Sequence, residues 1–316
     1  MITIWVPKRL VEVDLYNVAA RSPQALAQLS ENSYARRVQY AAQKVRGSGA
    51  KIVMLTGPSA SGKTTSAHCL AKALVQQGTP AQVVSLDNFF KGAAYYPKMP
   101  DGTLDYENLE TLDLPLIKQC LHQLSETGKT ELPIYDFKSG TTGSWFRMQG
   151  DRDAVIIAEG IHMLNPLIFD RVRDMATGVY VAPRTRIITT HDKIVRPEQL
   201  RVARRMIRDY QGRGHSLRQT VERAESVDRG ERNYIMPNKP NAGIHIDTFH
   251  DYEPCILARY LKEIPEFYTQ LDDAFIDEHG LTDLFEVVNS VPPLKTDYVP
   301  RDSIVREFVG GSIFQY

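Results

Sequence analysis

The sequence predicts an α/β fold of three layers, in which a central parallel sheet lies between two layers of helices. Segments typical of buried strands alternate along the chain with segments typical of helices. Two strand segments, 51–56 and 153–158, are largely apolar, as expected of strands covered on both faces. A glycine-rich loop follows the first of them, and a helical segment follows the loop. These observations indicate parallel strands joined by right-handed crossovers.

Length and composition are typical of a globular protein. The 316 residues can bury a large core in one domain or two, and 42% of them are hydrophobic. Basic and acidic residues balance at 38 each, which argues against stable binding to nucleic acid or to an anionic membrane. Three separated cysteines fit neither a disulfide framework nor a metal site. With no signal peptide and no membrane span recognisable, we expect a cytoplasmic protein.

The first part of the chain, 1–49, is expected to be an N-terminal extension of short strands and a helix. The strands fall within 1–15. The helix is predicted to begin at Pro23 after the N-cap Ser22 and to run to about residue 45. Its basic part, 34–46, is interpreted as a solvated face rather than a docking surface.

The phosphate-binding loop is the most specific motif. Residues 57–64 read GPSASGKT, which matches the pattern GxxxxGK[ST] between a strand and a helix. Glycines in this loop let backbone N–H groups turn inward, and the start of the following helix adds partial positive charge. Lys63 is expected to reach the β- and γ-phosphates, and the Thr64 hydroxyl to bind Mg²⁺. The predicted nucleotide-binding residues are Gly57, Ser59, Ala60, Ser61, Gly62, Lys63, Thr64 and Thr65.

The remaining elements follow from apolar spacing. Strands are expected at 81–86, 178–181 and 243–249, and helices at 65–77, 108–123 and 254–270. An α/β domain is predicted at 50–259. The proline-broken segment 260–316 is expected to be a helical or irregular C-terminal extension packed on this domain.

Three carboxylates fall at or near the carboxyl ends of predicted strands, where ligands of open parallel sheets bind. Asp87 follows the strand at 81–86, Glu159 follows the strand at 153–158, and Asp105 lies in the loop before the leucine-rich helix. Phosphoryl transfer requires a Mg²⁺ ligand, a carboxylate near the acceptor hydroxyl and cations on the moving phosphoryl group. We interpret these residues as parts of such a site rather than as turn or helix caps.

The cations that phosphoryl transfer requires are expected to come from a basic helical segment, predicted at about 197–230. Arg205 and Arg208 lie three residues apart on one helix face, and Arg213 follows one turn later, before a glycine. A solvated basic face is the alternative interpretation. Beside a phosphate-binding loop, we favour a mobile lid that places guanidinium groups on the triphosphate.

Taken together, these residues resemble the uridine kinases, in the uridine–cytidine kinase and phosphoribulokinase branch of the phosphate-loop kinases. The resemblance covers about residues 50–250 and implies a P-loop NTPase fold with a helical lid. Its ordered signatures are 57–65, SLDNFF at 85–90, Leu104-Asp105, LPIYDF at 132–137, AEGI at 158–161 and the lid sequence at 204–214.

The resemblance implies a role for each matching residue. Asp87 would orient or deprotonate the 5′-hydroxyl, and Asp105 would hold the ribose hydroxyls. Tyr135 and Phe90 would line the base pocket. The remaining implied contacts are Glu159 and Thr64 to Mg²⁺, and Arg205, Arg208 and Arg213 to phosphate or the acceptor sugar.

The sequence departs from the family pattern on the acceptor side. Gly140 stands where uridine–cytidine kinases carry a histidine that contacts the pyrimidine, and His215 stands where the lid carries an arginine. Residues 183–197 form an apparent insertion. The tail at 299–312 is similar to that of a longer bacterial branch of uridine-kinase-like proteins, and the resemblance assigns it no chemistry.

We therefore expect an ATP- and Mg²⁺-dependent kinase of a pyrimidine nucleoside, with Lys63, Asp87, Arg205 and Arg208 in catalysis. Thymidine, another nucleoside, or a sugar or sugar phosphate is the alternative acceptor. A non-catalytic nucleotide-binding module is the alternative from another class of protein. The expected partner is a small molecule, and an assembly of identical chains is compatible with the sequence.

Overall fold

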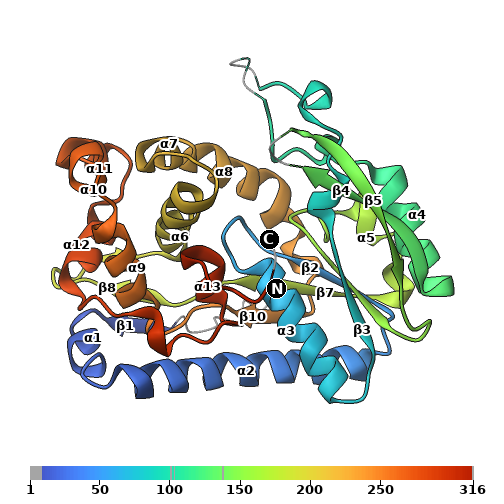
Figure 1. The fold of residues 1–316 in the computed structure, drawn as a ribbon, viewed down its shortest axis with the longest axis horizontal. Coiled ribbons are helices and arrows are strands. Elements are labelled where there is room, and N and C mark those ends of the chain that lie inside the picture. Colours follow the sequence, from blue (N-terminus) through green and yellow to red (C-terminus); the bar gives the residue numbers. More distant parts are fainter. Residues whose placement is uncertain (1–8, 100–101, 103, 137–138, 315–316) are drawn as a thin grey trace, which may run out of the picture.

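The computed structural model describes residues 9–99, 102, 104–136 and 139–314. Its centre is a sheet of five parallel strands in the order β10–β7–β2–β6–β3 (Figure 1). The strands are β2 (Ile52–Thr56), β3 (Ala81–Ser85), β6 (Val155–Glu159), β7 (Ala176–Ala182) and β10 (Ile244–Asp247). All five were expected from the sequence. Because they are parallel, their carboxyl ends meet at one edge of the sheet.

The two faces of the sheet carry separate parts of the core. In β2, Val53 and Leu55 belong to one buried cluster, whereas Ile52 and Met54 belong to another. Successive side chains of a strand point to opposite faces, so the two clusters lie on opposite sides of the sheet. The first face is covered by α2 (Pro23–Ser48) and α3 (Lys63–Gln76), and the second by α4 (Leu114–Thr127) and α5 (Pro166–Phe169). The predicted three-layer α/β fold is confirmed.

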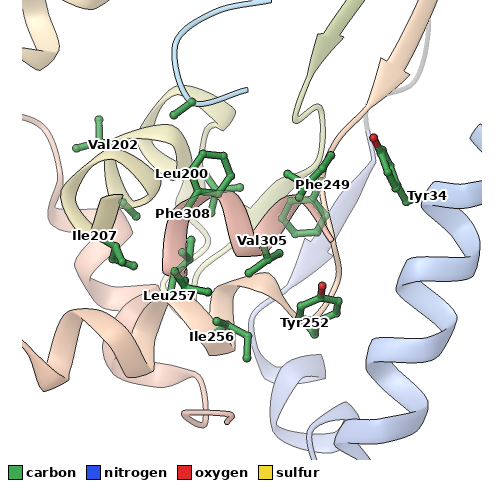
Figure 2. Close-up of a cluster of buried hydrophobic side chains, with 14 of the residues drawn as sticks. Tyr34, Leu200, Val202, Ile207, Phe249, Tyr252, Ile256, Leu257, Val305 and Phe308 are labelled. Atoms are coloured by element: carbon green, nitrogen blue, oxygen red, sulfur yellow. The ribbon is translucent and has the colours of Figure 1, made fainter. Parts of the chain in front are cut away.

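A second group of helices extends the first core cluster. The group includes α6 (Pro197–Gly212), α9 (Glu253–Glu263) and α13 (Ile304–Val309). Figure 2 shows side chains from all three meeting: Leu200 of α6, Leu257 of α9 and Phe308 of α13. The short helices α7 (Leu217–Glu222), α8 (Ala224–Gly230), α10 (Phe267–Gln270), α11 (Asp273–Glu278) and α12 (Thr282–Ser290) follow in the same half of the molecule.

Both extensions predicted from the sequence contribute to this same cluster. Val38 and Val45 of α2 and Val305 and Phe308 of α13 are buried in it together with Val53 of the central sheet. The first described strand, β1 (Leu10–Glu12), pairs with β8 (Arg186–Ile188), and β8 pairs with β9 (Ile194–Val195). The apparent insertion at 183–197 is therefore a small sheet that attaches the start of the chain to the core.

An antiparallel hairpin was missed by the sequence analysis. It consists of β4 (Lys129–Asp136) and β5 (Thr141–Gln149), and it lies beside α4 at the end of the molecule opposite α12 (Figure 1). Nearly every residue of β5 is exposed. The strand therefore lacks the alternation of buried and exposed residues on which sequence recognition of strands depends.

Two helix boundaries differ from the prediction. The helix expected at 108–123 begins only at Leu114, because Asp113 caps it by accepting from the N–H of Leu116 at 3.0 Å. Residues before Asp113 form a 3₁₀ turn over Leu109–Thr111. The helix expected at 254–270 is divided after Glu263, where the residue before a proline is extended.

Other expectations are met or fall outside the described residues. Helix α2 begins at Pro23, as predicted, and continues to Ser48. The strand expected within 1–15 is found at Leu10–Glu12, followed by α1 (Asp14–Ala19), while 1–8 lie outside the described residues, as does Phe137 of the 132–137 signature. Across the described part of the chain, no helix combines the length and apolarity required to cross a bilayer.

Because α13 fills the core, truncating one of its buried side chains should destabilise the whole molecule. We expect Phe308→Ala to lower the free energy of unfolding by about 3–5 kcal/mol, since a large aromatic side chain leaves a cavity. Ile313→Ala, at a position 54% exposed, is the control and should change it by less than about 1 kcal/mol. Urea denaturation measures both values. Equal effects of the two substitutions would contradict this placement of α13.

Candidate functional site

The phosphate-binding loop connects β2 to α3 in a conformation that two glycines make possible. A Cβ on Gly57 would lie 2.0 Å from the carbonyl oxygen of Val181, so only glycine allows the loop to pass the end of β7 this closely. Gly62 adopts a φ of +85°, which is the left-handed region that favours glycine. Ala60 also has a positive φ, +57°, although it carries a side chain. The loop therefore holds local strain that surrounding contacts must offset.

Two buried arginines of α6 supply such contacts. Arg201 donates to the carbonyl oxygen of Ser59 at 3.1 Å, and Arg204 donates to that of Ala60 at 3.0 Å. Arg204 is fully buried and forms an ion pair with the equally buried Glu253, including a 2.8 Å hydrogen bond. Because each peptide unit is planar, fixing these carbonyls also fixes the orientation of the next N–H group.

These contacts change the interpretation of the arginine-rich segment. Arg201, Arg204 and Arg205 are at most 3% exposed, so the solvated-face interpretation is wrong for them. Helix α6 is part of the core, and Leu217 and Val221 of the predicted lid are buried in the same cluster. Closure of the lid over a nucleotide stays a prediction.

The carboxyl ends of β2, β6 and β3 bring the loop and Glu159 together. The Glu159 carboxylate accepts from the Thr64 hydroxyl at 3.2 Å and from the Ser85 hydroxyl at 2.6 Å. Glu159 is 2% exposed. Its burial, together with the charge of Asp87, raises its pKa to about 7, while the Lys63 ammonium opposes that rise. A cation bound beside this carboxylate would favour its charged form.

We call the group of carboxylates formed by Asp87, Glu107 and Glu159 the acidic cleft. Asp87 follows β3 at the carboxyl edge of the sheet. It is exposed in the first turn of a 3₁₀ helix, Leu86–Phe89, that directly follows β3. Its negative charge helps to raise the pKa of Glu159 and of Glu107, which places the three carboxylates around a common space. The charge of the Lys63 ammonium opposes the rise in pKa of both glutamates, and this ammonium donates to the carbonyl oxygen of Pro58 at 3.2 Å. Asp87, Glu159 and Lys63 are thus gathered as the sequence predicted.

Asp105 has partners that the sequence analysis did not identify. Its carboxylate accepts from the Tyr234 hydroxyl at 2.7 Å and from the Asn108 side chain at 3.3 Å. Glu107, two residues later, is packed against the backbone of Gly230, where a Cβ would lie 2.5 Å from the Glu107 Cβ. Tyr234 and Gly230 come from the chain after α7, so this chain closes one side of the acidic cleft.

Arg205 is a buried cation whose guanidinium nitrogens make no hydrogen bond within the described part of the chain. Burial, and then the neighbouring charge of Arg201, lower its pKa to about 10, so it remains charged at neutral pH. Its charge acts on Glu107 at the acidic cleft. Arg208 and Arg213 instead both pair with Asp209, at 2.8 and 3.6 Å. Arg205 therefore retains donors that an anionic ligand can accept.

Aromatic rings line the cleft on the side of the hairpin. The ring centroids of Phe90 and Tyr135 are 5.5 Å apart, and Tyr96 lies 6.1 Å from Phe90. Gly140, at a φ of +69°, lies at the hairpin turn, and a Cβ there would be 3.9 Å from the Tyr135 hydroxyl. A side chain at this position would reach the ring cluster, and the glycine leaves that space open.

A cavity of about 520 Å³ adjoins the ring cluster. Its lining includes Asn88 and Phe90 from the loop after β3 and Pro133 and Trp145 from the hairpin. Among the described residues, Asp87 and Asp105 are not part of the lining, so the cavity is a neighbour of the acidic cleft rather than the cleft itself.

Sequence reasoning missed several residues of the site. Tyr234 lies more than a hundred residues from its partner Asp105, and no local pattern marks it. His162 is 1% exposed and stacks edge-on against Tyr234 at 5.8 Å, and burial lowers its pKa to about 4, so it is neutral. Arg201 and Arg204 were visible in the basic segment, but their spacing did not reveal that they contact the phosphate-binding loop.

Comparisons with known proteins show which family this chain is similar to. A model of the phosphoribulokinase / uridine kinase family matches residues 52–253. The uridine kinase of Lactobacillus johnsonii is 30% identical over 195 residues, which are 61% of this chain and 84% of that protein. The uridine kinase of Bacillus pumilus is 30% identical over 197 residues, 62% of this chain and 85% of that protein. A solved phosphoribulokinase from Rhodobacter spheroides aligns with a TM-score of 0.43 and 18% identity, over 63% of this chain and 70% of that one.

Proposed function

The chain belongs to the phosphoribulokinase and uridine kinase family and is a phosphotransferase that acts on an alcohol group, and we propose that it transfers the γ-phosphate of ATP to the 5′-hydroxyl of a pyrimidine nucleoside, with uridine or cytidine as the acceptor. The observation that carries the proposal is the position of Glu159. Its carboxylate accepts from Thr64 of the phosphate-binding loop and from Ser85, two residues before Asp87. One buried group thus joins the nucleotide side of the cleft to the acceptor side.

The nucleotide side would hold ATP and Mg²⁺. The loop from Gly57 to Thr65 and the start of α3 offer backbone N–H groups and a partial positive charge to the phosphates. Within the described residues no cluster of three or more His, Cys, Asp or Glu side chains is arranged to hold a metal ion. Thr64 and Glu159 supply hard oxygen ligands, which suit a Mg²⁺ ion that keeps water and phosphate oxygens as its other ligands. The ion would neutralise charge on the phosphates.

The acceptor side would use Asp87 to activate the hydroxyl. Asp87 is exposed, so its carboxylate would be open to accept the proton of an incoming alcohol. Asp105, held by Tyr234 and Asn108, keeps acceptor capacity for vicinal hydroxyls of a sugar. Phe90 and Tyr135 offer aromatic faces for a base.

Cations would stabilise the transferred phosphoryl group. The Lys63 ammonium acts on the carboxylates of the acidic cleft by its charge, and Arg205 presents unpaired donors from α6. Arg208 and Arg213 pair with Asp209, and their guanidinium groups would turn toward phosphate when a nucleotide binds. In this proposal residues 50–259 form the kinase domain, and 1–49 and 260–316 are extensions of it.

A different acceptor is the second candidate. Gly140 leaves open the space beside Tyr135 where uridine–cytidine kinases carry a histidine that contacts the pyrimidine. This makes thymidine, another nucleoside, or a sugar or sugar phosphate the alternative acceptor.

A panel of acceptors tests the assignment. Purified protein with Mg²⁺ and ATP is mixed with each common nucleoside, sugar and sugar phosphate, and ADP release is monitored. We expect uridine or cytidine to give the highest kcat/KM. Turnover confined to a sugar phosphate would overturn the nucleoside assignment and leave the phosphotransferase class intact.

Removing the proposed general base, Asp87, should slow phosphoryl transfer without weakening the binding of the nucleotide. We expect Asp87→Asn to lower kcat by about 10²–10⁴-fold, since a group that takes or orients the acceptor proton contributes that range. The dissociation constant for Mg·ATP should change by less than about threefold, because Asp87 lies outside the loop. Asp113→Asn, at a helix cap of the same region, is the matched control. Turnover of Asp87→Asn equal to that of the control would exclude the role.

A further inference from the structure

Helix α13 lies against the phosphate-binding loop, although it follows the family-matched region by fifty residues. Its Glu307 carboxylate accepts from the Thr65 hydroxyl at 2.6 Å. Its Ile304 side chain packs on Gly62, where a Cβ would lie 2.8 Å from the Ile304 Cγ2 atom. The C-terminal segment thus contacts both the last glycine of the loop and the first turn of α3.

A third contact passes through Arg204. The ring of Phe308 lies under the Arg204 guanidinium at 4.8 Å, and that guanidinium holds the carbonyl oxygen of Ala60. Figure 2 shows Phe308 and Val305 facing the side chains of α6 and α9. Two buried side chains of α13, Ile304 and Phe308, therefore contact the loop directly or a residue that holds it.

The hydrogen bond to Thr65 differs from the apolar contacts in being directional. Thr65 is fully buried, so its hydroxyl requires a partner, and a carboxylate acceptor makes the stronger, charge-assisted kind of bond. Thr65 directly follows Thr64, whose hydroxyl donates to Glu159. Holding Thr65 fixes the first turn of α3, where N–H groups and the Thr64 hydroxyl must point at the phosphates.

From these contacts we infer that Glu307 is a positioning residue for ATP, acting through Thr65, and that α13 is part of the nucleotide site. The inference rests on the proposed use of ATP, and it gives the C-terminal extension a function in the reaction. Glu307 touches neither the phosphates nor the acceptor in this role. It sets the geometry of the residues that do.

The chain provides a matched control for the test. Asp302 also joins the C-terminal segment to α3, through a 3.0 Å ion pair with Lys72, but this pair is exposed and lies away from the loop. Surface ion pairs contribute little to stability. Asp302→Asn and Glu307→Gln therefore each remove one carboxylate charge that joins the C-terminal segment to α3, and only the second acts beside the phosphate-binding loop.

The experiment measures the equilibrium binding of Mg·ATP by isothermal titration calorimetry, in the absence of acceptor. The melting temperature of each variant is recorded as well. We expect Glu307→Gln to weaken binding about tenfold, because the neutral amide oxygen of glutamine still accepts from Thr65 but makes a weaker bond than the charged carboxylate. Asp302→Asn should bind within twofold of the unchanged protein. In steady-state assays, Glu307→Gln should raise KM for ATP and leave KM for the acceptor unchanged.

A double-mutant cycle separates positioning from a general loss of stability. In a Thr65→Val background, Glu307→Gln should have no further effect on binding, because the bond is already absent. Additive effects, binding equal to that of Asp302→Asn, or failure of Glu307→Gln to fold while Asp302→Asn folds would each overturn the inference. If the unchanged protein bound no Mg·ATP, the proposed function itself would fail, so the two failures are distinguishable.

Discussion

The site depends on the interactions that the buried guanidinium group of Arg204 makes. It is fully buried, and it meets the Glu253 carboxylate, the carbonyl oxygens of Ala60 and Thr248, and the ring of Phe308. A charge in the core is tolerated only when its donors are satisfied, and breaking such a set by removing one partner costs about 3–5 kcal/mol. The strained backbone of the phosphate-binding loop is therefore tied to four separate parts of the chain.

This arrangement explains how a loop with unfavourable dihedral angles can exist before a nucleotide binds. Preorganised donors need no rearrangement when charge develops, which is the main way in which enzymes stabilise a transferred phosphoryl group. Beyond the loop, the parallel strands bring Glu159 and Asp87 to the same edge of the sheet. The core thus fixes the phosphate-binding loop rigidly, whereas the proposed acceptor side consists of loops, the hairpin and the segment after α7.

Features with a local cause could be predicted from the sequence. The strands, the phosphate-binding loop and the positions of Asp87 and Glu159 follow from apolar runs, glycine spacing and the geometry of parallel sheets. The start of α4 was wrong because Asn108 caps only a 3₁₀ turn, and the true cap, Asp113, lies five residues later. Contacts between distant residues, such as Tyr234 with Asp105 or Glu307 with Thr65, have no local signal, so the sequence could not reveal them.

The central claim is that Arg204 holds the phosphate-binding loop in its binding conformation. Hydrogen–deuterium exchange of the loop amides in Arg204→Lys tests it most directly, because lysine keeps the charge but lacks the planar fork that satisfies several acceptors at once. Faster exchange over residues 57–64, with unchanged exchange in the outer helix α4, is the predicted result. Unchanged exchange in the loop of a folded Arg204→Lys protein would contradict the claim.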